Sequence, residues 1–209
     1  GGDELAEEFP TRKKAGSGMG VVRPSSAAAA SISTSAEGPD GIILHSADEK
    51  WVAQFRLDGC TVSRLQPYTN WDELRAKASE LWMRYQAAAQ PAKIVRVATR
   101  FINRIPLPPG ESFEKTFSTT FSLSPELPQA VAGFLLRVVI PFEQEQATAI
   151  VTQSLEGTGT ECLFDLDVFA EQDQGFSNDE AWERLESLRE VKNKLFFGSL
   201  TPAALEGFQ

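Results

Sequence analysis

Hydrophobic and polar residues alternate with the period of a β-strand most clearly across residues 93–105. Four mostly apolar residues fall on one face of the predicted strand: Val95, Val97, Thr99 and Phe101. Three arginines fall on the opposite face: Arg96, Arg100 and Arg104. Successive side chains of a strand point to opposite faces of a sheet, so this segment predicts a strand with one apolar and one cationic face.

The same reading along the chain predicts six more strands. They span residues 42–44, 51–57, 60–65, 133–140, 146–155 and 162–169. Residues 106–130 contain five prolines and are expected to form an irregular excursion. Near the start, a short amphipathic fragment ends at Pro10, and the Gly-, Ser- and Ala-rich residues 16–40 are typical of a linker. We therefore expect a partial N-terminal helix and disordered linker over residues 1–40, and a single α+β domain over residues 41–209.

Two helices are predicted from capping signals followed by apolar residues at helical spacing. Asn70 with Glu73 marks the first start, and Ser177 with Glu180 marks the second. The apolar stripes include Trp71, Leu74, Leu81, Trp82, Trp182, Leu185 and Leu188. The order is strands, helix, strand, loop, strands, helix. It predicts an α+β fold: one mostly antiparallel sheet with both main helices packed on one face.

Charged residues gather on the sheet face that the helices leave uncovered, if each strand turns its apolar side toward the core. The predicted members of this face are Gln54, Arg56, Arg96, Arg100, Arg104, Arg137, Asp165 and Asp167. Three interpretations stay open: a solvated surface held by cross-strand ion pairs, a binding or self-association surface, or an active site. An active site would use Asp165, Asp167 and Arg100 on an anionic substrate.

Net charge and cysteine content narrow the class of protein. A formal charge of -9 argues against a nucleic-acid binder, because such a protein needs a basic surface. It also argues against binding to anionic membrane surfaces. Neither a long apolar span nor a secretory signal is recognised. Two isolated cysteines, Cys60 and Cys162, indicate reduced thiols rather than a disulfide framework. We therefore expect a cytoplasmic protein that binds neither nucleic acid nor membranes.

Catalytic and metal-binding residues are sparse. His45 is the only histidine, so any Ser–His or Cys–His nucleophile must be built on it. Asp165 and Asp167 offer oxygen ligands for a divalent cation, but a third ligand is missing and arginines nearby oppose a cation. No cysteine or histidine pair has zinc-ligand spacing. We expect no metal, no cofactor and no catalytic residues, although an enzyme stays the alternative.

An ordered series of short motifs resembles one family of bacterial proteins. The motifs are Gln54-Phe55-Arg56, Asp58-Gly59, Ser63-Arg64-Leu65, Pro67-Tyr68, Trp71, Arg100-Phe101-Ile102-Asn103-Arg104-Ile105, Leu166-Asp167 and Asn193-x-x-Phe196-Phe197. The family is sporadically distributed, uncharacterised and without an assigned activity. The resemblance spans residues 41–208 and implies that an opening strand of the family is missing here, so the chain is expected to be N-terminally incomplete or divergent. It supplies no catalytic residues, and its distribution implies an accessory or defence-linked role.

The function expected from these observations is non-enzymatic. The charged sheet face is predicted to bind a protein partner or a second copy of the chain as a homodimer. By analogy of architecture alone, small chaperone-like folds offer a comparable uncovered sheet.

Overall fold

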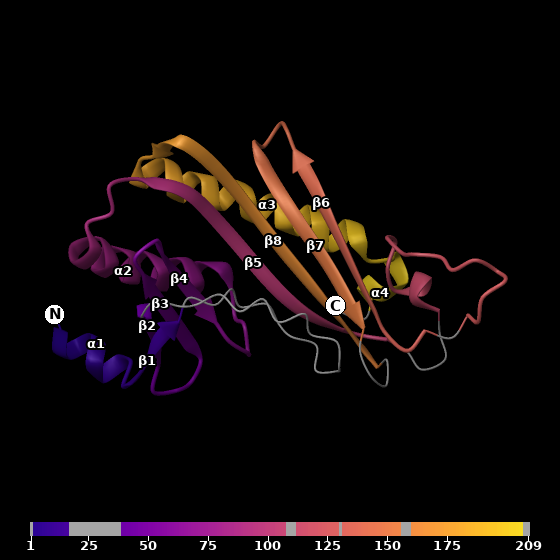
Figure 1. The fold of residues 1–209 in the computed structure, drawn as a ribbon, viewed down its shortest axis with the longest axis horizontal. Coiled ribbons are helices and arrows are strands. Elements are labelled where there is room, and N and C mark those ends of the chain that lie inside the picture. The colour runs from indigo at the N-terminus through magenta and orange to yellow at the C-terminus, as the bar shows by residue number, and fades with distance from the viewer. Residues whose placement is uncertain (1, 17–38, 108–111, 130, 156–159, 207–209) are drawn as a thin grey trace. The chain divides into compact units, whose positions relative to one another are not determined.

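The computed structural model of the chain describes residues 2–16, 39–107, 112–129, 131–155 and 160–206. The chain divides into two compact units, Gly1–Ala92 and Lys93–Gln209, called the N-terminal and C-terminal units below. Each unit contains a four-stranded antiparallel sheet and one long helix (Figure 1). Each also has its own hydrophobic cluster.

In the N-terminal unit the strands follow each other in chain order. A short helix, α1 (Gly2–Glu8), precedes β1 (Thr11–Gly16), β2 (Pro39–His45), β3 (Trp51–Arg56) and β4 (Gly59–Arg64), and the sheet order is β1-β2-β3-β4. The helix α2 (Trp71–Ala89) then packs on the sheet. The buried cluster consists of Phe9, Leu44, Trp51, Ala53 and Leu81. This small core is completed by the apolar stripe predicted for α2.

Both long helices begin where their capping residues predict. The Asn70 side chain accepts a hydrogen bond from the Glu73 backbone N–H at 2.8 Å, which satisfies one free donor at the start of α2. Gln90 ends α2 in the left-handed conformation, with φ of 46°. Ser177 and Glu180 form a complete capping box at the start of the second long helix, α3 (Asn178–Ser199).

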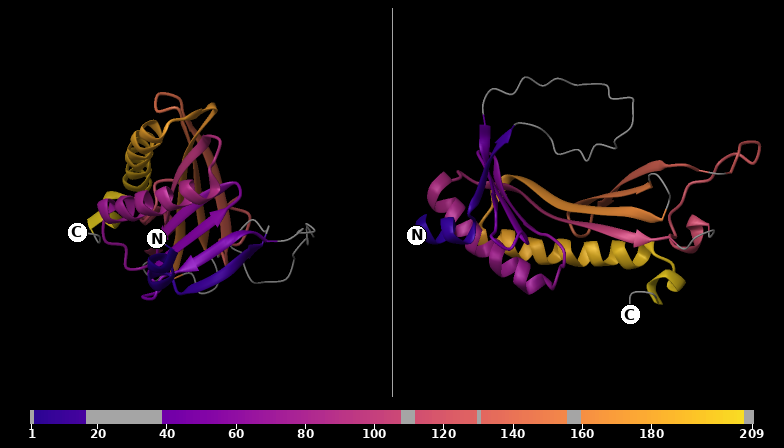
Figure 2. Two further views of the ribbon diagram at one scale, coloured as in Figure 1. Left: turned by 90° about the vertical axis from the view of Figure 1, so that its left-hand side faces the viewer. Right: turned by 90° about the horizontal axis from the view of Figure 1, so that it is seen from below.

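In the C-terminal unit the first strand pairs with the last. The elements are β5 (Ile94–Pro106), a single 3₁₀ turn η1 (Phe113–Lys115), β6 (Phe134–Phe142), β7 (Ala147–Leu155), β8 (Glu161–Phe176), α3 and the short α4 (Pro202–Glu206). The sheet order is β5-β8-β7-β6. The helix α3 runs along one face of this sheet, packed on β5 and β8 (Figure 2). That face carries a large core that includes Val97, Ile105, Phe164, Leu166, Val168, Leu188, Val191 and Leu195.

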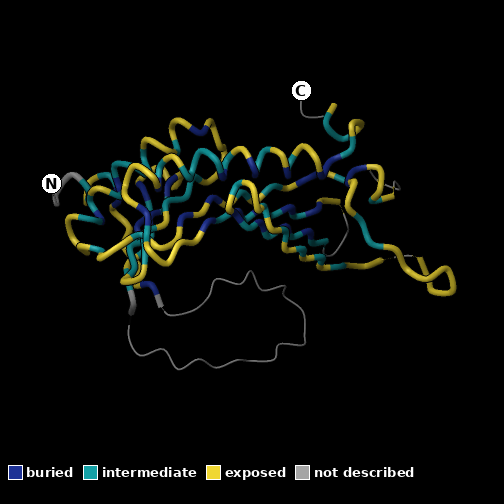
Figure 3. Tube along the Cα trace, turned by 90° about the horizontal axis from the view of Figure 1, so that it is seen from above, coloured by how far each residue is buried: buried dark blue, intermediate teal, exposed yellow. Residues whose placement is uncertain are grey.

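The long connection from β5 to β6 closes one end of this core with aromatic rings. Phe113 stacks on Phe117 with ring centroids 4.6 Å apart, and Phe117 meets the buried Phe164 edge-on at 5.3 Å. The described residues after Phe121 are exposed up to residue 129 (Figure 3). The excursion is irregular, as predicted, but its first part is a structural element of the core.

The α+β class with antiparallel pairing is confirmed, whereas the single sheet with both helices on one face is wrong. The strands form two sheets, each packed with its own helix, and the expected single domain over residues 41–209 becomes part of two compact units. The physical reason is that alternation reveals which side of a strand is apolar. It does not reveal which other strand lies beside it.

Three local expectations also change. Order begins before residue 41, because residues 11–16 form β1 paired with β2. The predicted linker falls at residues 17–38, outside the described residues. The last strand continues to Phe176, because its polar end pairs with the start of β5. Val95 is 45 % exposed instead of sharing the face of Val97, because the register shifts between Ile94 and Arg96.

Candidate functional site

The candidate site is the face of the C-terminal sheet opposite α3, called the open face below. Its charged members, taken from strand register and alternation, are Arg96, Arg100, Arg104, Arg137, Glu161, Asp165, Asp167 and Glu171. Its large apolar members are Ile102, Leu135, Val139, Ile150, Leu163 and Phe169. Among the described residues of this unit, no helix covers this face.

Cross-strand register arranges the open face in rows that run from β6 through β7 and β8 to β5. One row contains Arg137, Thr152, Asp165 and Ile102, and the next contains Val139, Ile150, Asp167 and Arg100. The arginines on β5 and the carboxylates on β8 therefore form adjacent columns. Opposite charges on neighbouring strands stabilise a sheet by about 0.2–1 kcal/mol for each pair.

Arg100 and Asp165 form the best-defined pair. The guanidinium donates from Nη2 to Asp165 Oδ2 at 2.5 Å and from Nε to Oδ1 at 2.9 Å. Both carboxylate oxygens of Asp165 are thus held by one guanidinium. The Asp165 side chain is only 14 % exposed, and this hydrogen bond raises the pKa of Arg100. The pair fixes both side chains across the boundary between β5 and β8.

The other two arginines of β5 make looser contacts. Arg96 Nε lies 3.3 Å from Glu171 Oε1, and its guanidinium lies over the Phe169 ring at 4.1 Å from the centroid. Arg104 Nη1 lies 3.5 Å from Glu161 Oε2, with both side chains about half exposed. Each arginine of β5 therefore has an acidic neighbour on β8. Together these contacts form a series of ion pairs along the boundary between β5 and β8.

Two charged groups at the centre of the open face lack a close partner. Asp167 lies 3.9 Å from Arg96 Nη2, beyond hydrogen-bond distance, and burial raises its pKa despite the nearby arginines. Arg137, on β6, makes no hydrogen bond or ion pair with the described part of the chain. Arg137 is one of the arginines whose charge opposes that rise in pKa, so Arg137 and Asp167 of one chain attract each other at longer range.

Six of the eight predicted site residues lie together on the open face: Arg96, Arg100, Arg104, Arg137, Asp165 and Asp167. The grouping of Gln54 and Arg56 with them is wrong, because both lie on β3 of the other sheet. There Arg56 Nε lies 3.3 Å from Asp58 Oδ1. Gln54 is half-buried on the sheet face opposite Trp51 and Ala53.

Several residues of the open face escaped the sequence analysis although a signal for them exists. Glu161 and Glu171 have the same parity along β8 as Asp165, and they are the partners of Arg104 and Arg96. Likewise, Leu135 and Val139 have the same parity along β6 as Arg137. The sequence analysis assigned only polar and charged residues to this face. It left out the exposed apolar residues that lie between them.

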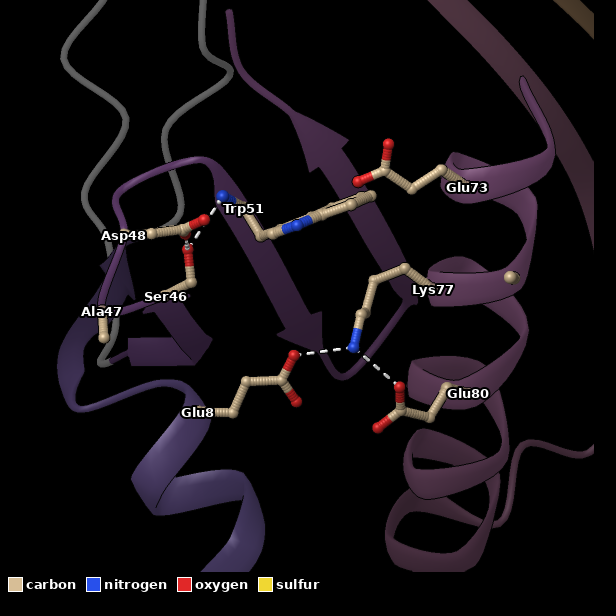
Figure 4. Close-up of a pocket in the computed structure, with 9 residues that line it drawn as sticks. Glu8, Ser46, Ala47, Asp48, Trp51, Glu73, Lys77 and Glu80 are labelled. Carbon is tan, nitrogen blue, oxygen red and sulfur yellow. Dashed lines mark hydrogen bonds and ion pairs between the residues drawn. The ribbon is translucent and has the colours of Figure 1, made fainter. Parts of the chain in front are cut away.

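A separate hollow of about 550 Å³ lies in the N-terminal unit, between α1, α2 and the turn that joins β2 to β3 (Figure 4). Lys77 Nζ spans it, donating to Glu8 Oε1 at 2.6 Å and to Glu80 Oε2 at 2.8 Å. Burial alone lowers the pKa of Lys77, but the hydrogen bonds to both carboxylates together outweigh it and raise the pKa. The carboxylates of Glu8 and Glu80 therefore already bind the Lys77 ammonium group. This contact joins α1 to α2.

The turn at the edge of this hollow gives no support for a nucleophile built on His45. The Ser46 hydroxyl donates to Asp48 Oδ1 at 2.6 Å and accepts from the Trp51 backbone N–H at 2.9 Å. Ser46 is the first residue after β2, and its hydroxyl is occupied by these two hydrogen bonds within the turn. Ser46 therefore organises the turn.

Within the described ranges, no group of three or more histidine, cysteine, aspartate or glutamate residues lies close enough to hold a metal ion. None of the described helices is both long and apolar enough to cross a membrane. Neither a protein-family model, nor a curated protein, nor a solved structure matches this chain. The family resemblance drawn from short motifs thus stays a prediction.

Proposed function

We propose that this is a non-enzymatic binding protein whose open face docks a protein chain. The carrying observation is the composition of that face: exposed apolar residues stand among ordered ion pairs. Leu135, Val139 and Ile102 are 69 %, 54 % and 52 % exposed. Large exposed apolar groups rimmed by polar groups are typical of interaction surfaces.

The balance of charge favours a protein over a nucleic acid. The open face carries four arginines and four carboxylates, so it lacks the excess of cations that phosphate binding requires. Arg100 and Asp165 hold each other in place before a partner arrives. Because these side chains are already ordered, docking costs less side-chain entropy.

The enzyme alternative gains no support from this geometry. Arg100 is 47 % exposed and Arg104 is 64 % exposed, so these groups lie on a surface rather than in a cleft. Both oxygens of Asp165 are held by Arg100. A reaction on an anionic substrate would first have to break that pair.

A site-specific photocrosslinker tests the proposal. p-Benzoylphenylalanine at Val139 places the probe on the open face, and the same residue at Phe197, 58 % exposed on α3, is the matched control. We expect light-dependent adducts to a protein from the Val139 variant in cell extract or in the purified protein. We expect none from the Phe197 variant. Equal adducts from both positions, or none from Val139, would contradict the proposal.

Arg100→Ala provides the second arm. Arg100 is 47 % exposed, but the Asp165 side chain that it leaves unpaired is only 14 % exposed, so the free energy of unfolding should fall by about 1–3 kcal/mol. Crosslinking at Val139 should nevertheless be lost, because Asp165 no longer has its fixed position. Thermal unfolding followed by circular dichroism checks the first expectation. Unfolding of the variant instead would show that the pair is structural.

A further inference from the structure

We propose that the occupant of the open face is a second copy of this chain, stacked face to face about a twofold axis that runs along β7. This inference rests on the proposed function and names its partner. A twofold dimer uses the same patch on both copies, so the patch must be complementary to itself. The rows of the open face allow this to be checked residue by residue.

The strand order makes the face self-complementary about β7. Because β6 and β8 flank β7, an axis along β7 lays β6 of each copy over β8 of the other. Arg137 on β6 shares its row with Asp165 on β8, and the neighbouring row contains Asp167. Each Arg137 therefore arrives at the two carboxylates of the other copy.

The charges left incomplete within one copy are the ones this arrangement completes. Arg137 makes no ion pair with the described residues, and the cation nearest to Asp167 in the structure is 3.9 Å away. Asp165 is already bound by Arg100. Arg96, Arg100 and Arg137 of the same chain attract Asp167 only at longer range. In the dimer the Arg137 guanidinium of the other copy reaches Asp167, and the pair occurs twice by symmetry.

Apolar residues meet in the same arrangement. Leu135 on β6 shares its row with Leu163 on β8, so each of these leucines lies over the other in the second copy. Pro141 on β6 shares its row with Phe169 on β8, two rows beyond Arg137, so these two residues also lie over each other in the dimer. Ile150 lies on the axis strand itself. Leu135 and Pro141 of β6 are thereby covered by apolar residues, whereas Val139 shares its row with Asp167 and lies over that carboxylate.

An axis along β7 overlaps β6, β7 and β8 and leaves β5 of each copy outside the other sheet. β6 and β7 contain nine residues each. With about 3.3 Å per residue and about 4.8 Å between strands, the three-stranded overlap spans about 430 Å². Stable protein interfaces bury about 800 Å² on each partner, so this interface is small and its affinity depends on the charge pairs.

Charge reversal tests the dimer. We expect the purified wild-type chain to be dimeric by light scattering coupled to gel filtration. Arg137→Glu and Asp167→Lys should each weaken the dimer at least tenfold, because each places like charges opposite one another. An equimolar mixture of the two variants should restore a dimer, since the introduced carboxylate of one then meets the introduced ammonium of the other, while the second contact keeps its native pair. Arg189→Glu, on α3, is the control and should stay dimeric.

The crosslinker supplies a readout that does not depend on how the charge variants fold. In purified protein, the Val139 probe should give an adduct between two copies, mapped by mass spectrometry to β8. A monomeric wild-type chain overturns the dimer, and so does a dimer that Arg137→Glu leaves unchanged. A Val139 adduct to a different protein from extract, with a monomeric chain, overturns the dimer while supporting the proposed function. No adduct of either kind contradicts both.

Discussion

The two units share a plan, four antiparallel strands and one long helix, but they place their charged networks on opposite sides of the sheet. In the N-terminal unit, Lys77 on α2 binds Glu8 and Glu80 on the helix side. In the C-terminal unit, Arg100 binds Asp165 on the side that α3 leaves uncovered. The comparison teaches that an ion-pair network is informative about function through its location. A network beside the packed helix fixes the fold, whereas the one on the uncovered face forms the surface that we propose binds a partner.

The two units also differ in the size of their buried cores. The C-terminal cluster contains many more buried residues than the N-terminal cluster, which depends on Phe9, Leu44, Trp51, Ala53 and Leu81. Each unit also contains one cysteine, Cys60 or Cys162. Burial raises the pKa of Cys60 to about 12 and that of Cys162 to about 11, so both thiols are unreactive while their unit is folded. The thiols therefore report separately on the two units.

The largest effect is expected from Phe164→Ala. Phe164 is fully buried between Phe117 and Phe196, and its truncation should lower the free energy of unfolding of the C-terminal unit by about 3–5 kcal/mol. Alkylation of Cys162 should accelerate at least about a hundredfold, since each 1.4 kcal/mol is a factor of about ten. Alkylation of Cys60 should stay nearly unchanged. Mass spectrometry of the labelled peptides measures both rates.

The control for this prediction lies on the same sheet. Leu135→Ala removes an apolar side chain that is 69 % exposed on the open face, and should change stability by less than about 0.5 kcal/mol. If Phe164→Ala accelerates Cys60 as much as Cys162, the two units unfold together, and the division drawn above fails.

A smaller effect, of opposite sign, is expected at Gln153. This side chain is 1 % exposed on the core face of β7, and neither Nε2 nor Oε1 has a hydrogen-bond partner in the described structure. A buried polar group without a partner costs about 1–3 kcal/mol, so Gln153→Met should raise the free energy of unfolding by about that amount. Gln54→Met, on the half-buried face of β3, should have little effect. Urea denaturation compares the two, and destabilisation by Gln153→Met would mean that its amide is satisfied.

The smallest predicted effects concern pH and have opposite signs in the two units. The hydrogen bond from Lys77, and to a smaller extent the one from Arg84, lowers the pKa of Glu80 below 4.5. Burial has the opposite effect on this pKa but is outweighed. Its stabilising contribution is therefore present above pH 4.5 and is lost as the pH falls through the lower folded value. Burial raises the pKa of Asp167 above 3.8. Its charge therefore disfavours folding at neutral pH, and this penalty is relieved as the pH falls through the raised value.

Two isosteric variants separate these contributions. Glu80→Gln should be less stable than wild type at neutral pH, and the difference should vanish as the pH falls below the lowered pKa of Glu80. Asp167→Asn should be the more stable chain at neutral pH and should lose that advantage on acidification. Thermal melts from neutral to acidic pH in dilute protein, where a dimer dissociates, measure both differences. Parallel pH profiles for the two variants would refute the contrast.

The faces of individual strands could be predicted from the sequence, whereas their partners could not. Alternation placed Arg100 and Asp165 on one side of a sheet, and the structure confirms their contact. Alternation also placed Gln54 there, although β3 pairs with β2 and β4. Strand pairing depends on packing between distant segments, and no period within one strand encodes it.

Elements without a clear pattern could not be predicted at all. Residues 11–16, mostly basic and polar, form β1 only because the edge of β2 offers hydrogen-bonding partners. The last part of β8 is polar and continues as a strand because β5 lies beside it. At the candidate site, the incomplete pairing of Arg137 is likewise a property of its neighbours. Local sequence cannot report such properties.

The pairing of β5 with β8 also has a consequence for the chain as it is being made. β5 is complete at Pro106, but β8, its partner among the described strands, begins at Glu161. At a synthesis rate of about 5–20 residues per second, β5 waits about 3 to 11 s with both edges unpaired. An unpaired strand with one apolar face is prone to aggregate, and charged residues placed along it oppose this. The arginines of β5 therefore oppose aggregation of the nascent strand before they become part of the open face.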